Sequence, residues 1–292
     1  MGQSQYLLHS RSARATTDGY FTKSVNDIFE QNKKRQIHES MDPKNAKIRE
    51  ARDSVAHPNS FPIIVDLDVT GSMGRIPHHL VKDGLPNMVS EIAEGGVPDP
   101  AILFMATGDS KHDRYPFQVG QFESGDVELD MWLTRTYLEG GGGGNQGESY
   151  AWAWYFAANH CVTDAWEKRH IKGVLFTIGD EHCHATMTNS ELSEVMGVKG
   201  EVSLKAEDLL RAAQEKWNVY HLHILEGGGA STLSSWQKLL GKNCIPVENH
   251  ETLDKVMAEI VKQNHSGKQS IVSMEKDDES VHITEEEELN LL

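Results

Sequence analysis

Short apolar runs alternate with segments of helical periodicity between residues 60 and 265 of this chain. The apolar runs lie at residues 62–69, 101–108, 115–122, 172–179, 218–225 and 244–247. Segments with apolar residues at helical spacing lie at residues 77–94, 126–138, 147–161, 203–217, 231–241 and 251–263. Short apolar runs bounded by glycine or polar residues are typical of buried strands. The alternation predicts an α/β fold, a doubly wound, Rossmann-like and mainly parallel sheet flanked by helices.

Two of these segments contain residues that disturb regular structure. The run at 115–122 is short and contains Gly120, so we expect an edge strand there. The helical segment at 77–94 contains Gly84 and Pro86, and proline cannot donate the backbone hydrogen bond of a helix interior. We therefore expect a break or a kink in this helix.

Polar clusters follow three of the predicted strands. They read DVTGSM at residues 68–73, GDS at 108–110 and GDEHCH at 179–184. In doubly wound folds, ligands bind at the carboxyl ends of the strands. Three separate loops of this kind predict a binding site at that edge of the sheet.

The stretch FPIIVDLDVTGSMG, residues 61–74, can be interpreted in two ways. Counted from Asp68 it reads D-x-T-x-S, which brings a carboxylate and the hydroxyls of Thr70 and Ser72 together around the tight turn at Gly71. Oxygen ligands of this kind suit Mg²⁺. With few negative charges around it, the ion stays electrophilic and can accept a carboxylate from outside.

Counted from Asp66, the same stretch reads D-x-D-x-T and resembles the first motif of haloacid dehalogenase-like phosphohydrolases. That resemblance implies Asp66 as the nucleophile and Asp68 as the general acid/base. Thr107 would stand for the second motif, and Asp180 with Glu181 would hold Mg²⁺. The family's spaced acid pair is absent, because GDEHCH contains no second aspartate, and no lysine is clearly placed to balance a phosphate. We keep this interpretation as the alternative.

The first interpretation resembles the metal-ion-dependent adhesion site (MIDAS) of intracellular von Willebrand factor A (vWA) domains, whose pattern is D-x-S-x-S. Asp68, Thr70 and Ser72 match its first loop, and Asp180 matches the aspartate of its third loop. The second loop departs from the family's Gly-Gly-Thr stretch, because the sequence there reads GGGGGNQGESYAWA. Asn145 occupies the place of the threonine.

The resemblance leaves four accessory positions around this predicted metal set. Ser149 is the substitute for Asn145 in the second loop, and Asp109 and Glu181 follow the second and third long strands. Asp66 lies inside a predicted buried strand, where an unpaired carboxylate costs free energy. It tunes the charge of the metal site or pairs with a basic residue that the sequence does not identify.

The vWA resemblance implies Mg²⁺-dependent (or Mn²⁺-dependent) binding of a protein that offers an Asp or Glu to the ion. It implies a non-enzymatic adaptor or subunit of an intracellular assembly, commonly beside an AAA+ ATPase, and a bacterial or phage source. A further alternative is a structural subunit that self-assembles when the acidic tail of one protomer reaches the metal of the next.

Composition excludes some classes of function. A formal net charge of −16 disfavours a general nucleic-acid binder, and the absence of an 18-residue apolar run disfavours a membrane span. Three widely spaced cysteines, an odd number, indicate a reducing cytoplasm.

Charge also divides the chain into three parts. Residues 1–59 are expected to form an N-terminal extension packed on the domain, and residues 60–265 to form the vWA-like domain. Residues 266–292 are expected to be an acidic, disordered tail. The last five residues of this tail, ELNLL, are either part of a solvated tail or a docking peptide for a partner.

Overall fold

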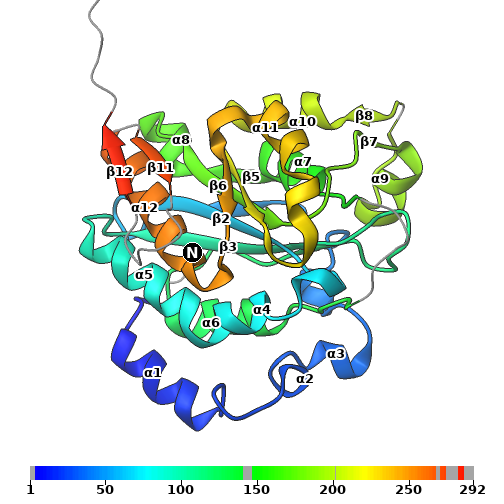
Figure 1. Ribbon diagram of the computed structural model, residues 1–292. Coiled ribbons are helices and arrows are strands. Elements are labelled where there is room, and N and C mark those ends of the chain that lie inside the picture. The colour runs from blue at the N-terminus through cyan, green and yellow to red at the C-terminus, as the bar shows by residue number, and fades with distance from the viewer. Residues whose placement is uncertain (1–3, 141–146, 201, 268–269, 274–281, 286–292) are drawn as a thin grey trace, which may run out of the picture.

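A six-stranded sheet forms the centre of the computed structural model (Figure 1). The structure describes residues 4–140, 147–200, 202–267, 270–273 and 282–285. The strand order is β10-β9-β6-β2-β3-β4, and all neighbours are parallel except the β3–β4 pair. The strands are β2 (Phe61–Asp68), β3 (Pro100–Thr107), β4 (Phe117–Val119), β6 (Gly173–Gly179), β9 (Trp217–Ile224) and β10 (Cys244–Val247). The predicted α/β fold is confirmed, and the run at 115–122 supplies the antiparallel edge strand.

Helices cover both faces of this sheet (Figure 1). On one face α12 packs against α5, and on the other α10 packs against α7. The helices are α4 (Ile76–His79), α5 (Leu85–Glu94), α6 (Asp126–Thr134), α7 (Ala151–His160), α8 (Asp164–Arg169), α9 (Asn189–Met196), α10 (Ala206–Gln214), α11 (Leu233–Leu240) and α12 (Leu253–Ser266).

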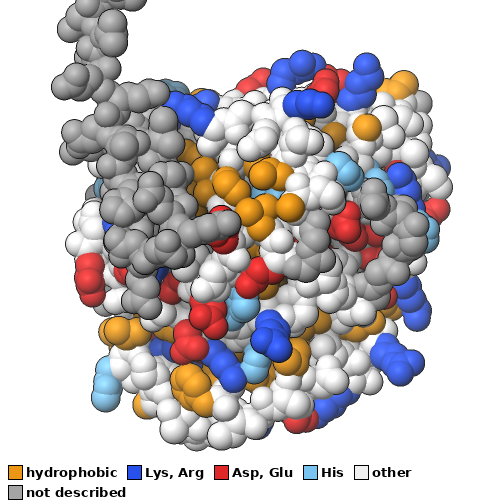
Figure 2. Space-filling model, viewed as in Figure 1, with side chains coloured by type: hydrophobic (Ala, Val, Ile, Leu, Met, Phe, Trp, Pro, Cys, Tyr) orange, Lys and Arg blue, Asp and Glu red, His pale blue; other side chains and the backbone are white. Residues whose placement is uncertain are grey.

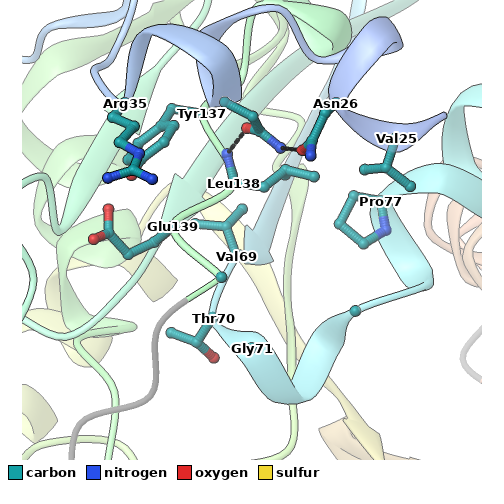
Figure 3. A pocket seen from close by; sticks show the side chains of 13 residues that line it. Val25, Asn26, Arg35, Val69, Thr70, Gly71, Pro77, Tyr137, Leu138 and Glu139 are labelled. Carbon is teal, nitrogen blue, oxygen red and sulfur yellow. Dashed lines mark hydrogen bonds between the residues drawn. The ribbon is translucent and has the colours of Figure 1, made fainter.

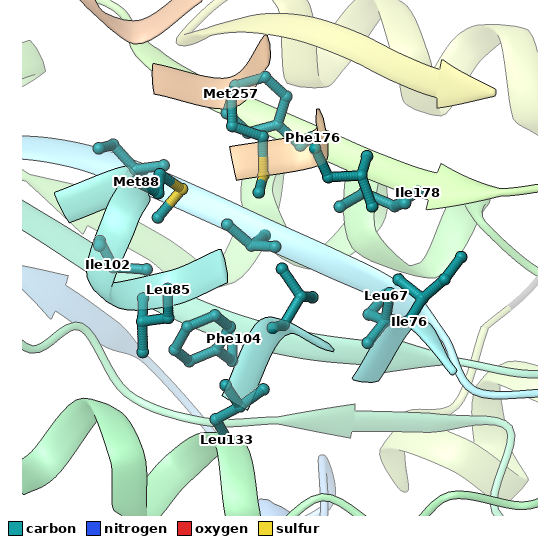
Figure 4. Packing of buried hydrophobic residues seen from close by; sticks show 14 of the residues in the cluster. Leu67, Ile76, Leu85, Met88, Ile102, Phe104, Leu133, Phe176, Ile178 and Met257 are labelled. Carbon is teal, nitrogen blue, oxygen red and sulfur yellow. The ribbon is translucent and has the colours of Figure 1, made fainter. Parts of the chain in front are cut away.

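Alternate side chains of β2 enter the two cores. Ile63, Val65 and Leu67 belong to the core under α5 and α12, which Figure 4 shows closely packed around Phe104 and Met257. Because strand side chains alternate between faces, Asp66 and Asp68 point to the opposite face, under α7. The two aspartates therefore share one side of the sheet.

The chain reverses its winding direction at β2. It passes from β2 to β3 and β4 on one side, then returns to β6 on the other side of β2. The carboxyl ends of the parallel strands β2 and β6 consequently lie side by side at the topological switch point, where doubly wound folds bind ligands.

The loop after β2, residues 69–75, contains most of the predicted metal-binding motif and is called the metal loop below. The helical segment that follows it is distorted but not broken at Pro86. A π turn at Leu80–Gly84 joins α4 to α5. A π turn closes a wider ring than an α turn, which accommodates the missing N–H group of proline. The expected kink therefore takes the form of a local widening.

The N-terminal segment lies outside α4 and α6 (Figure 1). It contains the helices α1 (Leu8–Thr17), α2 (Val25–Ile28) and α3 (Gln31–Lys34). The buried Arg11 of α1 contacts Asp130 of α6, with 3.2 Å between Nε and Oδ1, and also donates to the carbonyls of Val81 and Lys82. These contacts fasten the segment to the domain.

The described residues also form three small two-stranded sheets. They pair β1 (Arg49–Ala51) with β5 (Cys161–Thr163), β7 (Thr186–Met187) with β8 (Leu204–Lys205), and β11 (Ser270–Ser273) with β12 (His282–Glu285). The last pair is antiparallel and falls within the segment expected to be disordered. No helix among the described residues is long and apolar enough to cross a membrane.

Candidate metal centre

The carboxyl ends of β2 and β6 bring four of the predicted metal ligands together. After β2, Thr70 donates to Asp68 Oδ1 twice, from its backbone N over 2.8 Å and from its Oγ1 over 2.6 Å. Ser72, in the next turn, donates from Oγ to Oδ1 of Asp180 over 2.9 Å. The hydroxyl oxygens of Thr70 and Ser72 are 3.4 Å apart. Asp68 is fully buried while Ser72 is exposed, so the group opens to solvent on the side of Ser72.

The second loop contributes a residue that the sequence did not single out. Asn145 lies outside the described residues, and Glu148 follows it just before α7. Glu148 is 5% exposed, and its Oε2 has no hydrogen-bond partner among the described residues. Its backbone N donates to His182 O over 2.8 Å and its carbonyl accepts from His184 N over 2.9 Å, which fixes this loop beside the one after β6. The signal available in the sequence is that Glu148 is the first acidic residue after the glycine run at residues 140–144.

Tyr150, immediately before α7, forms a hydrogen bond with Asp68. Its Oη donates to Asp68 Oδ2 over 2.8 Å, and its ring is fully buried. Gly179 at the end of β6 makes this contact possible, because a Cβ there would overlap the tyrosine hydroxyl. Both oxygens of Asp68 are thereby oriented by residues from different parts of the chain.

Asp66 lies deeper in the sheet than the predicted metal ligands. It is fully buried, and the Thr107 Oγ1 lies 2.8 Å and 3.0 Å from its two carboxylate oxygens. Its hydrogen-bond partner is thus a hydroxyl, not a basic side chain. A nucleophile must reach its substrate, so this burial disfavours the phosphohydrolase interpretation of Asp66.

The remaining accessory residues connect the loops to one another. Asp109 accepts from Nδ1 of His112 over 2.5 Å and from Nε2 of His184 over 2.8 Å. Ser149 accepts at its Oγ from the backbone N of Ser110 over 2.9 Å. Asp109 and Ser149 therefore tie the loops after β3 and β6 and before α7 together.

Glu181, like Glu148, has a buried Oε2 atom without a hydrogen-bond partner among the described residues. Burial, and then the neighbouring Asp180, raise the pKa of its carboxyl. It adds a further acid beside the end of β6.

Burial is the first cause of raised pKa values throughout this group. It raises the pKa of Asp68 to about 7, of Asp66 to about 8 and of Glu148 to about 10, and neighbouring carboxylates add to each shift. Across the described parts of the chain, no Lys or Arg forms an ion pair with these three acids or with Asp180. Buried carboxyls without a positive partner favour either a proton or a cation.

The donor set fits a hard divalent cation that accepts hydroxyl ligands. Within the ranges that the structure describes, no three His, Cys, Asp or Glu side chains form a metal-binding group. Any cation here would therefore depend on the hydroxyls of Thr70 and Ser72, as the D-x-T-x-S pattern predicts. The buried Oε2 of Glu148, which has no hydrogen-bond partner among the described residues, supports the same fit, because a nearby cation would offset the free-energy cost of burying it.

Comparisons with known proteins give a limited result. No protein-family model matches this chain, and no curated protein matches its sequence. Among solved structures, the pilus adhesin SpaC from Lactobacillus rhamnosus GG in its open conformation is similar at 9% identity and a TM-score of 0.48, over 74% of this chain and 31% of the adhesin. The chain thus spans less than a third of that protein.

Two further solved structures are similar at the same level. An aerotolerance-related membrane protein from Bacteroides fragilis NCTC 9343 matches at 12% identity and a TM-score of 0.42, over 70% of this chain and 99% of that one. Proximal thread matrix protein 1 from the mussel byssus matches at 11% identity and a TM-score of 0.47, over 75% and 49% of the two chains. At these identities and TM-scores, none of these proteins decides the family or the function of this chain.

Proposed function

We propose that this chain is a vWA-like protein-binding module whose adhesion site holds Mg²⁺ or Mn²⁺. The observation that carries the proposal is the hydrogen-bonded group of Asp68, Thr70, Ser72 and Asp180, drawn from loops 108 residues apart. These residue types at the topological switch point suit a hard cation.

The proposed roles follow from the position of each side chain. Thr70 and Ser72 hold the ion through their hydroxyl oxygens, and Asp68 and Asp180 orient these hydroxyls and supply negative charge. Glu148 takes the place of the second-loop threonine. When bound, the ion offers an electrophilic position that an Asp or Glu of a partner protein can occupy.

The biological setting is a proposal of the same kind. A cytoplasmic adaptor in an assembly, for example beside an AAA+ ATPase, is what the vWA resemblance implies. A binding role without catalysis is consistent with the buried position of Asp66, because a buried carboxylate is not accessible to a substrate as a nucleophile.

Calorimetric titration with Mg²⁺ and Mn²⁺ tests the proposal on wild type, Ser72→Ala and Asp66→Asn. We expect Ser72→Ala to lose at least tenfold in affinity, because it removes a direct oxygen ligand, and Asp66→Asn to lose little. The exposed Ser234→Ala on α11 is the matched control. Loss of binding in Asp66→Asn alone would instead support the phosphohydrolase interpretation, and screening of phosphate esters would follow.

A further inference from the structure

A cleft of about 530 Å³ opens directly beside the metal loop (Figure 3). Four parts of the chain line it: the metal loop with Val69 and Thr70, α4 with Pro77, the segment after α6 with Leu138, and the N-terminal segment with Val25 and Arg35. Its volume lies within the range of ligand-binding pockets. Anything bound in this cleft would lie next to the proposed cation.

The N-terminal wall of this cleft is held in place by specific contacts. Asn32 accepts at Oδ1 from the backbone N of Leu138 over 2.9 Å, and its Nδ2 donates to Asn26 Oδ1 over 3.0 Å (Figure 3). Arg35 follows α3 with a φ of 52°, a left-handed conformation that costs free energy in a residue other than glycine. The wall is therefore a built part of the cleft.

The cleft combines one cationic side chain with an apolar surface. Arg35 is exposed and forms no ion pair among the described residues. Its guanidinium faces Glu139 across the cleft in Figure 3, and burial raises the pKa of the Glu139 carboxyl above its ordinary value. Val25, Pro77 and Leu138 supply the apolar surface.

This combination fits a peptide segment in which acids directly precede apolar residues. One carboxylate would face the cation beside Thr70, a second would face Arg35, and the apolar side chain would cover Leu138. The chain itself contains such a segment, because Glu285–Glu288 is followed by Leu-Asn-Leu-Leu at residues 289–292.

Charge is complementary between this segment and the cleft's N-terminal wall. Residues 25–35, which include this wall, contain 3 Lys and Arg against 2 Asp and Glu, whereas residues 275–292 contain 8 acids against 1 lysine. In residues 61–274, 29 Asp and Glu outnumber 17 Lys and Arg, although Figure 2 shows basic side chains on several parts of the surface. The wall that carries Arg35 is the part suited to attract it.

The position of β12 decides whether the segment can bind its own cleft. The ring of His265, near the end of α12, lies 5.3 Å from the ring of Phe61 at the start of β2. The metal loop follows the other end of β2, and eight residues of strand span ~26 Å between Phe61 and this loop. Glu285 is paired with Ser270 shortly after α12, and Figure 1 shows this hairpin far from α4. Glu288 can extend only ~10 Å beyond Glu285. The segment therefore does not reach its own cleft while β11 and β12 are paired.

We infer that the Glu288–Leu289 segment of one copy docks in the cleft of a second copy, beside its metal loop and Arg35. This inference rests on the proposed metal site and names the partner as the chain itself. Each copy is both donor and acceptor, so the contact assembles reciprocal dimers, rings or longer chains.

Sedimentation of the full chain in Mg²⁺ and in EDTA tests the inference. We expect concentration-dependent association in Mg²⁺ and monomers in EDTA. Arg35→Ala removes a charged contact and Leu289→Ser an apolar one, so each weakens association roughly tenfold or more. The matched controls Lys34→Ala and Asn290→Ser change neighbouring positions and should associate as wild type does.

Mixing the two defective variants gives a sharper test. Arg35→Ala retains an intact tail segment and Leu289→Ser retains an intact cleft, so an equal mixture forms dimers that neither variant forms alone. Wild type that binds Mg²⁺ by calorimetry yet stays monomeric would overturn the inference and leave the proposed function standing, with the cleft serving another partner. Association that persists in EDTA would also overturn it. Failure to bind Mg²⁺ would refute the proposed function itself.

Discussion

Tyr150 donates a hydrogen bond from Oη to Asp68 Oδ2 over 2.8 Å, although 82 residues separate them in the chain. The tyrosine ring makes edge contacts with His221 and Trp236, with ring centroids 5.4 Å and 5.2 Å away. A side chain from the core on the α7 side of the sheet thus orients Asp68, the first residue of the predicted metal-binding motif.

Tyr150→Phe should weaken Mg²⁺ binding without unfolding the protein. The change removes a donor that favours the charged form of Asp68, so the pKa of Asp68 rises and fewer carboxylates are available to the cation. We expect roughly a tenfold loss of affinity by calorimetry and an almost unchanged melting temperature. Tyr155→Phe on the same helix is the control, and equal affinities for all three proteins would show that Tyr150 only fills space.

Glu148→Gln should separate metal binding from stability. Because burial and Asp68 raise the pKa of Glu148 to about 10, this carboxyl is protonated at pH 7 without metal. The substitution should therefore change the free energy of unfolding in EDTA by less than about 1 kcal/mol. In Mg²⁺ it should lose at least tenfold in affinity, since the glutamine cannot ionise.

Glu207→Gln, an exposed position on α10, is the control for this experiment. Full Mg²⁺ affinity in Glu148→Gln would remove Glu148 from the proposed ligand set. A large loss of stability in EDTA would instead show that the neutral carboxyl makes contacts the glutamine cannot reproduce.

The metal-free protein should lose stability as the pH rises from about 4 to about 8. Burial raises the pKa of Asp66 from 3.8 to about 8, so between these values the folded state holds a proton that the unfolded state has released. The stabilisation is complete below the unfolded pKa and is lost as pH rises toward the folded pKa, by at most about 1.4 kcal/mol per pH unit. Urea unfolding in EDTA at pH 5 and pH 8 measures this difference.

Asp66→Asn removes the titrating group and keeps an acceptor for Thr107. Its free energy of unfolding should therefore fall less between pH 5 and pH 8 than that of wild type. Parallel slopes for the two proteins would mean that Asp66 is ionised in the folded state across this range.

Arg11→Ala should detach the N-terminal segment from α6. The guanidinium is 1% exposed and contacts Asp130, which is 3% exposed, so its removal leaves a buried carboxylate with less positive charge nearby. Arg14 also contacts Asp130, at 2.7 Å, and retains part of the pairing. We expect a loss of about 3 kcal/mol in the free energy of unfolding.

Chemical denaturation would measure this loss of stability. Limited proteolysis in the chain that follows α1 would show whether the N-terminal segment has detached. Arg211→Ala removes an exposed pair with Asp208 within one helix turn and should cost less than about 0.5 kcal/mol. If Arg11→Ala were as stable as Arg211→Ala, the segment would be held by its apolar contacts alone.

The sequence by itself determined the elements of the fold and the first part of the site. Periodicity of two or of 3.6 residues is a local property, so it identified β2, β3, β6 and β9 and the helices between them. The D-x-T-x-S spacing is also local, because one tight turn brings Thr70 back to Asp68. Parallel strands end at one edge, which was sufficient to place Asp180 beside them.

Tertiary structure alone decided what completes and surrounds this site. The burial of Glu148 and the hydrogen bond from Tyr150 to Asp68 depend on how the chain at the start of α7 packs on the sheet, and neither has a signature in local spacing. The cleft beside Thr70 exists only because Asn32, 106 residues before Leu138, fastens the N-terminal segment to it. Such contacts depend on which surfaces remain after the sheet and its helices have packed, and residue spacing along the chain does not encode that outcome.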